Sequence, residues 1–175
     1  MNRRDSNALA VNLEMMGQLG ASSAAMRNHQ EVFSYWSSLR REGRLPGRAD
    51  IHPRGLKRLL PTVSLTEVVR EPLDYRLRLA GTGLYTVYGH EITGRSLREI
   101  YNRDAAGYWR AELDKVVLGR RPGVGCHNLA WKGAEHVSLV WIRLPLASDG
   151  ETVDMVLGYD CLVGVRAEIS GIRAA

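Results

Sequence analysis

The stretch YRLRLAGTGLYTVYGHEITG, residues 75–94, decides how the rest of the chain is interpreted. Tyr75, Leu77 and Leu79 alternate with arginines and an alanine, and this period of two predicts a β-strand with one apolar face. The glycines that follow break the chain into turns and helical segments too short for a long helix. This pattern is typical of the wall and mouth of a small cavity. It is not typical of a catalytic loop, because no nucleophile, base and acid cluster within it.

The length and composition describe a single folded domain with extensions. The chain has 175 residues and 45% hydrophobic residues, which is ordinary for a globular core. The sequence contains no run of 18 apolar residues, so no transmembrane helix is predicted. Polar residues such as Asp5, Asn7, Asn12 and Glu14 interrupt any apolar segment of a signal peptide, so we expect a cytoplasmic protein. Residues 1–27 are predicted to form a flexible tail.

The cysteines and histidines show no metal-binding pattern. Cys126 and Cys161 are far apart, and neither belongs to a CxxC motif or to a Cys/His ligand spacing. We interpret both as small buried hydrophobic side chains in a reducing compartment. No metal site is predicted.

Positive charge concentrates in one segment, residues 40–58. Seven basic residues and two acids lie there, and this excess equals the net charge of +5 of the whole chain. Such a segment could contact nucleic acid, anionic lipid or an acidic partner, or it could be a solvated connector. No aromatic platform accompanies it, which favours the connector. The candidate anion patch comprises Arg40, Arg41, Arg44, Arg48, Arg54, Lys57 and Arg58.

Two helices are predicted before the first strand. Residues 30–41 carry an apolar stripe that needs a cover, and we interpret it as an interface for a second copy or a partner. Residues 51–60 begin at a proline and end before Pro61. His52, at the position before this helix, is a poor capping residue, so a loose start is expected. The interface residues are Val32, Phe33, Trp36 and Leu39.

The remaining pattern predicts an α+β fold. Strands at 62–69 and 75–81 form a hairpin, short helices and a helix at 105–118 follow, and three strands at 124–131, 136–146 and 152–163 end the pattern. Ser96 and Glu99 fit a capping box, and Asp104 is a plausible cap for the long helix. The later strands are apolar on both faces, so either the helix carrying Trp36 or a second copy must cover the outer face.

The element order and three motifs together resemble a PAS domain, and more narrowly the stand-alone PAS-like proteins of alphaproteobacteria. The motifs are YWSSLRREGRLPGRADIHPRGLKRLLP at 35–61, RLAGTGLYTVYGHEITGRSL at 78–97 and LPLASDGETVDMVLG at 144–158. The resemblance implies a five-stranded antiparallel sheet with a helical insertion on one face. We divide the chain into a flexible tail (1–27), an N-terminal helical extension (28–61), the PAS-like domain (62–165) and a C-terminal tail (166–175).

Cofactor and enzyme classes find little support in the residues. No histidine lies between His90 and His127, so the long helix offers no axial haem ligand. The helical insertion also contains no cysteine for a flavin adduct. Hydrolase, phosphate-loop, calcium-loop and HExxH motifs are absent from the sequence. We therefore expect no catalytic residue and no haem or flavin.

A pocket between the sheet and the helical insertion is the candidate ligand site. It suits a small, partly apolar metabolite, although the same side chains could simply fill the core. Its predicted lining is Leu79, Tyr85, Tyr88, Trp109, Leu113, Cys126, Asn128 and Trp141.

Two functions follow from the sequence. The first is a non-catalytic sensory or regulatory module that forms a homodimer or docks on a protein partner, with a small ligand able to bias that contact. The alternative is a protein that binds nucleic acid or anionic lipid through the basic segment at 40–58.

Overall fold

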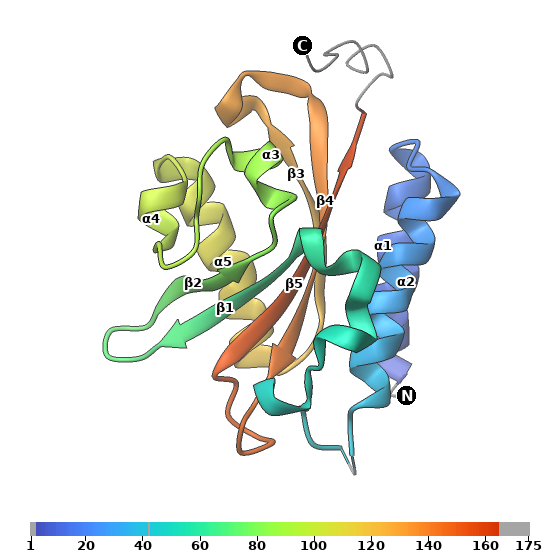
Figure 1. Cartoon of the computed structure of the whole chain (residues 1–175), viewed down its shortest axis with the longest axis vertical. Helices are drawn as coiled ribbons and strands as arrows, with labels where there is room; N and C mark the ends of the chain where they lie inside the picture. The colour runs from blue at the N-terminus through green and yellow to red at the C-terminus, as the bar shows by residue number, and fades with distance from the viewer. Residues whose placement is uncertain (1–2, 42, 165–175) are drawn as a thin grey trace.

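The computed structural model describes residues 3–41 and 43–164 and places one antiparallel sheet at its centre (Figure 1). The sheet has the strand order β2-β1-β5-β4-β3, so the first and last strands along the chain are neighbours at the middle of the sheet. This arrangement confirms the predicted α+β fold with five antiparallel strands. The strands are β1 (Val63–Val69), β2 (Asp74–Ala80), β3 (Gly123–Leu129), β4 (Ala134–Leu146) and β5 (Met155–Val163).

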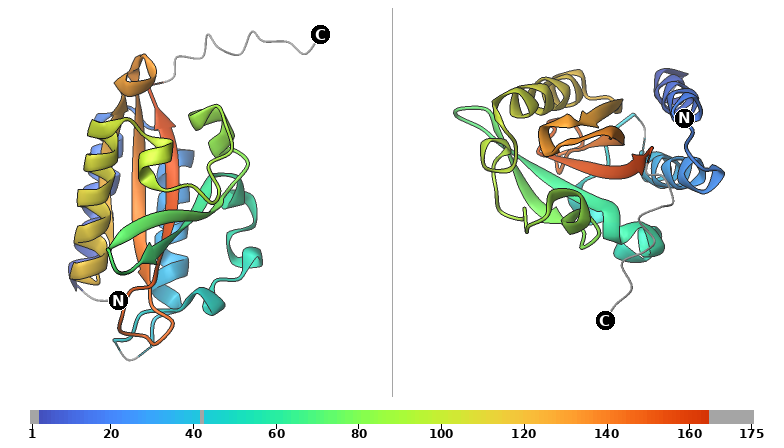
Figure 2. Two further views of the ribbon diagram at one scale, coloured as in Figure 1. Left: turned by 90° about the vertical axis from the view of Figure 1, so that its left-hand side faces the viewer. Right: turned by 90° about the horizontal axis from the view of Figure 1, so that it is seen from above.

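Helices cover both faces of this sheet (Figures 1 and 2). The insertion between β2 and β3 lies on one face and comprises α3 (Leu84–Tyr88), α4 (Leu97–Ile100) and α5 (Arg103–Gly119). A helical hairpin of α1 (Arg3–Gln18) and α2 (Ser23–Ser38) lies on the other face. Short 3₁₀ helices complete the fold: η1 (Arg48–Asp50), η2 (Pro53–Thr62) and η3 (Ala130–Lys132).

The surroundings of β4 explain why this strand carries apolar side chains on both of its faces. Trp141 packs against Trp109 of α5, with ring centroids 5.4 Å apart. The next residue back, Val140, packs against Met16 of α1 on the opposite face. Successive residues of a strand point to opposite faces, so a strand between two helical layers has no solvated side.

The hairpin replaces the flexible tail that the sequence analysis predicted for residues 1–27. Helix α1 is ordered along the sheet, and its Asn12 and Met16 are fully buried. Asn12 donates a hydrogen bond from Nδ2 to the carbonyl oxygen of Trp141, at 3.4 Å. Ser22 caps α2 by accepting a hydrogen bond from the amide of Ala25, at 3.2 Å. Burial of the apolar side of α1 against the sheet gives this short helix its stability.

The predicted interface residues of α2 belong to the core of the chain itself. Val32, Phe33 and Trp36 are fully buried, and Leu39 is partly buried. Trp36 also donates its indole N–H to the carbonyl oxygen of Pro145, at 2.9 Å. Of the two covers considered for the outer sheet face, the structure therefore uses the chain's own helix, and these side chains are not exposed to a partner.

A layer rich in sulfur lies between the hairpin and the sheet. Cys126 of β3 and Cys161 of β5 both pair with Val140 of β4, one on each side, so the two thiols share one face of the sheet. Both are partly buried free thiols. The helices contribute Met15, Met16 and Met26 to the same cluster.

One of the two helix caps predicted from the sequence is present, and the other is formed by a different residue. The capping box is present, since Glu99 accepts hydrogen bonds from both the backbone amide and the hydroxyl of Ser96, each at 2.7 Å. Helix α5 starts slightly earlier than predicted, because Asn102 rather than Asp104 is its cap and accepts from the amide of Ala105 at 2.9 Å. His52 makes no capping hydrogen bond, as expected.

Candidate functional site

The space between the sheet and the helical insertion is almost filled by side chains. The cavity that remains has a volume of about 20 Å³, which is room for one water molecule. Its walls come from all the elements that surround it: Ser64, Thr66, Leu77, Leu84, Tyr88, Ile92, Leu97, Tyr101, Trp109, Leu113, Arg143 and Asp160.

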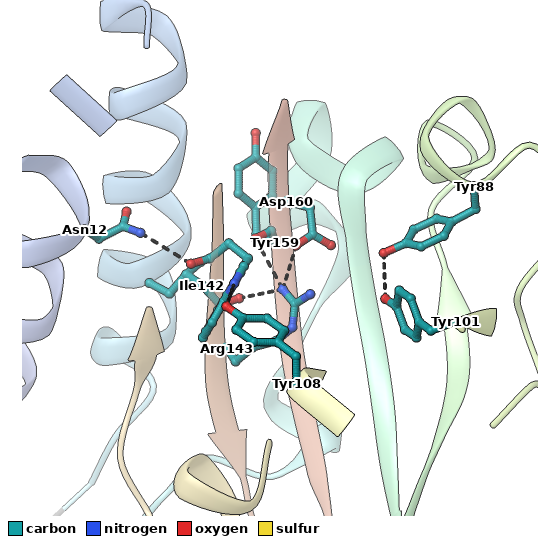
Figure 3. A network of polar contacts seen from close by, with 9 residues as sticks. Asn12, Tyr88, Tyr101, Tyr108, Ile142, Arg143, Tyr159 and Asp160 are labelled. Carbon is teal, nitrogen blue, oxygen red and sulfur yellow. Dashed lines mark hydrogen bonds and ion pairs between the residues drawn. The ribbon is translucent and has the colours of Figure 1, made fainter. Parts of the chain in front are cut away.

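A buried ion pair stands at the centre of this interior (Figure 3). The Nη1 of Arg143 on β4 lies 2.8 Å from Oδ1 of Asp160 on the neighbouring strand β5. The same nitrogen donates to the carbonyl oxygen of Ile142 at 3.1 Å. Both side chains are at most 6% exposed. Burial raises the pKa of Asp160 despite the nearby guanidinium, while Asp160 and the surrounding tyrosines raise the pKa of Arg143 against the effect of its burial.

Aromatic rings enclose the guanidinium. The carbon Cζ of Arg143 lies 4.7 Å from the ring centroid of Trp109 and 5.6 Å from that of Trp141, distances at which cation–π attraction operates. The hydroxyls of Tyr88 and Tyr101 are 2.8 Å apart and form a hydrogen bond on the other side of the cavity (Figure 3). Burial raises the pKa of both tyrosines, so they are neutral at physiological pH.

The structure brings together only part of the predicted pocket. Tyr88, Trp109 and Leu113 line the cavity, and Trp141 is buried beside it. Tyr85 is 59% exposed on α3, and the side chain of Asn128 is also exposed. Cys126 faces the hairpin on the opposite side of the sheet.

A β-bulge turns Leu79 away from the pocket in which it was predicted to lie. Leu65 of β1 pairs with Leu79, whereas the next residue, Thr66, pairs with Leu77, so Arg78 is the extra residue in β2. An extra residue reverses the facing of every side chain beyond it. Leu79 therefore lies on the outer face of the sheet, where it is 41% exposed.

The charged residues at the centre of the cavity were not predicted from the sequence. Arg143 and Asp160 sit inside the apolar runs VWIRLPL and VLGYDCLV, where a single charge is the signal that could have identified them. Tyr101 is also absent from the predicted lining of the pocket. Because the structure pairs the two charges through adjacent strands, only a correct strand register would have brought them together.

This interior does not fit a flavin or a haem in the present conformation. The cavity lacks the volume for either ring system. Both cysteines lie on the far side of the sheet, away from the insertion. No group of three or more His, Cys, Asp and Glu side chains that could hold a metal ion exists in the described ranges.

The basic segment is engaged largely with the chain itself. Arg44 donates to the carbonyl oxygen of Asp149, and Arg48 donates to that of Ile51 at 3.1 Å. Arg40 lies over the Trp36 ring at 5.2 Å. These contacts hold three of the seven basic side chains against other residues of the chain.

The remaining basic residues of η2 lie at the surface. Arg58 forms an ion pair with Glu31 of α2, and both side chains are more than a third exposed, so the pair contributes about 0–1 kcal/mol to stability. Arg54 and Lys57 are exposed on η2.

No helix within residues 3–41 and 43–164 combines the length and the apolar character needed to cross a membrane.

Comparison with known proteins identifies the family. A family model described as a PAS domain matches residues 24–161. No curated protein sequence matches the chain significantly.

Several solved structures are similar to part of this chain. The PAS domain of a protein from Colwellia psychrerythraea is 11% identical, with 65% of this chain and 98% of that chain covered and a TM-score of 0.45. The LOV protein of Rhodobacter sphaeroides is 21% identical over 60% of this chain and 62% of that chain, with a TM-score of 0.43. The light state of the blue-light photoreceptor Aureochrome1 LOV is 16% identical, over 67% and 91%, with a TM-score of 0.42. Since the PAS model extends from the start of α2 into β5, the protein belongs to the PAS domain family.

Proposed function

We propose that this chain is a non-catalytic regulatory module that acts by contact with a second copy of itself or with a protein partner, and that the α1–α2 hairpin controls this contact. PAS domains are generally non-catalytic sensory modules. The finer assignment is carried by one observation: the apolar outer face of the sheet is covered by a hairpin that buries several polar atoms for which the described residues offer no hydrogen-bond partner.

Those polar groups weaken the docked hairpin. Oδ1 of Asn12 and both ring nitrogens of His29 are buried and have no hydrogen-bond partner among the described residues. Each buried polar atom left unsatisfied costs about 1–3 kcal/mol. An apolar cover of the same size would bind more firmly, so the free energy needed to open this hairpin is reduced.

The strands β4 and β5 connect the hairpin to the cavity. The side chain of Trp141 packs beside Arg143 and Trp109, whereas its carbonyl oxygen accepts the hydrogen bond from Asn12. On β5, Asp160 faces the cavity and the adjacent Tyr159 packs against His29, with ring centroids 5.1 Å apart. A rearrangement in the cavity therefore displaces the same backbone on which the hairpin rests.

A charge placed under α1 is expected to open the hairpin and change the association state. Met16→Glu puts a carboxylate at a fully buried position, whereas Val11→Glu makes a similar change at a position of the same helix that is 49% exposed. In Met16→Glu we expect faster amide exchange in α1 and an increased mass in solution, because the uncovered sheet face will pair with a second copy. Hydrogen exchange and light scattering measure the two effects.

The matched control decides the interpretation. Val11→Glu should keep the exchange rates and the mass of the original chain. If Met16→Glu behaves like this control in both measurements, the hairpin does not control association and the proposal fails.

A further inference from the structure

A second hollow, larger than the cavity, lies on the outside of the helical insertion. It has a volume of about 570 Å³ and is formed by α4 and the residue after it, the first two turns of α5 and the start of β2. Its lining residues are Asp74, Leu97, Arg98, Tyr101, Arg103, Ala106, Gly107 and Arg110, which we call the insertion groove. The volume is within the range of about 300–1,000 Å³ that is typical of small-molecule sites.

The charges of the insertion groove are unbalanced. Arg110 is committed to β2, because its Nη2 donates to the carbonyl oxygen of Leu73 at 2.6 Å and its Nη1 lies 3.7 Å from Oδ1 of Asp74. Arg98 and Arg103 make no hydrogen bond or ion pair with any residue that the structure describes, and both are exposed. Three arginines against one aspartate leave the groove with a charge of +2.

Gly107 gives a second and independent indication. It lies inside the 17-residue helix α5, where glycine is the least favourable residue apart from proline. A Cβ atom at this position would meet no atom within 4 Å, so packing within the chain does not require a glycine. The missing side chain instead leaves open the groove that Gly107 lines.

We propose that the insertion groove binds a small organic anion that consists of a carboxylate joined to an apolar chain or ring. The planar guanidinium groups of Arg98 and Arg103 match a carboxylate, which can accept two parallel hydrogen bonds from one arginine. The apolar body lies along Leu97, Ala106 and the open surface at Gly107. This inference does not depend on the hairpin proposal, because binding is measurable without any signalling output.

An occupant of the groove would contact the wall of the cavity. Leu97 and Tyr101 line both hollows. The Tyr101 ring stacks on Trp109 with centroids 5.9 Å apart, and its hydroxyl contacts that of Tyr88. Binding in the groove is therefore expected to alter tryptophan fluorescence.

Octanoate is a suitable probe. Octanol, which lacks the negative charge, and acetate, which lacks the long apolar chain, are the control compounds. We expect saturable binding of octanoate to the full chain, seen by fluorescence and calorimetry, and much weaker binding of the other two. Arg103→Gln should weaken octanoate binding about tenfold through loss of a charge-assisted hydrogen bond. Gly107→Leu should weaken it at least as much by filling the groove.

A control variant separates an effect of Gly107→Leu on binding from an effect on folding. Leucine is a better helix former than glycine, and Ala111→Leu adds a similar side chain at an exposed position of the same helix. Ala111→Leu should bind octanoate like the original chain. The inference is overturned if the full chain shows no saturable binding, if octanol binds as tightly as octanoate, or if Gly107→Leu binds like Ala111→Leu.

Discussion

Replacing Asp160 with leucine is expected to lower the free energy of unfolding by about 3–5 kcal/mol. The change leaves the guanidinium of Arg143, a residue that is 5% exposed, without a carboxylate partner. The carbonyl oxygens that still accept hydrogen bonds from it do not compensate for the cost of keeping this charge out of water. Cation–π contact with Trp109 and Trp141 offsets only a small part of this cost. Denaturation in urea, followed by tryptophan fluorescence, gives the difference.

The matched control is the double replacement Arg143→Met and Asp160→Leu. Apolar side chains of similar size remove both charges, and such changes at buried ion pairs are often neutral or stabilising. We expect the double variant to be at least as stable as Arg143→Met alone and far more stable than Asp160→Leu. A loss below about 1 kcal/mol in Asp160→Leu would mean that water reaches Arg143 and that the interior is more open than described.

Lowering the pH from 7 to 4 is expected to destabilise the fold by about 3 kcal/mol through His29 alone. Burial lowers the pKa of His29 from 6.5 to about 4, and the charge of Arg143 across the sheet adds to this effect. The unfolded chain therefore binds a proton at a higher pH than the folded chain. Stability from this group is complete above pH 6.5 and is lost as the pH falls towards 4.

The measurement is a series of urea denaturations across this pH range, compared with His29→Leu. Protonation of carboxylates also destabilises proteins at low pH, so the variant serves to subtract that contribution. His29→Leu should show a flatter dependence by about 3 kcal/mol. Parallel curves for the two proteins would show that His29 is not buried as a neutral ring.

Much of the fold was predictable because its signals are local. The alternation around Tyr75 and the capping box at Ser96 each depend on a few neighbouring residues. The order of these elements was enough to predict the sheet. The apolar pattern on both faces of β4 also predicted correctly that a second layer covers the sheet.

The covering layer was assigned less well. Helix α1 carries Leu9, Leu13 and Met16 on one stripe, which is a signal for a helix packed on an apolar surface. Polar residues between them, including the buried Asn12, hid this stripe. The stripe on α2 was recognised, but a sequence cannot tell whether such a stripe packs within its own chain or against another.

The candidate pocket required information that only the register supplies. One bulge at Arg78 moves Leu79 to the outer face, and a strand pattern read at a strict period of two cannot reveal it. The partners Arg143 and Asp160 are 17 residues apart and meet only because β4 and β5 are paired. Trp109 and Leu113 of α5 both line the cavity, and their common face depends on helical spacing alone, which a sequence supplies.

The sulfur-rich layer gives this protein a built-in chemical reporter. Cys161 lies beneath the hairpin, and burial raises the pKa of its thiol, so the reactive thiolate is scarce while the hairpin is docked. Cys126 shares that face. The alkylation rate of the unmodified chain therefore measures how often the hairpin opens, and a compound or partner that stabilises the closed state will slow the labelling of both cysteines without any engineered probe.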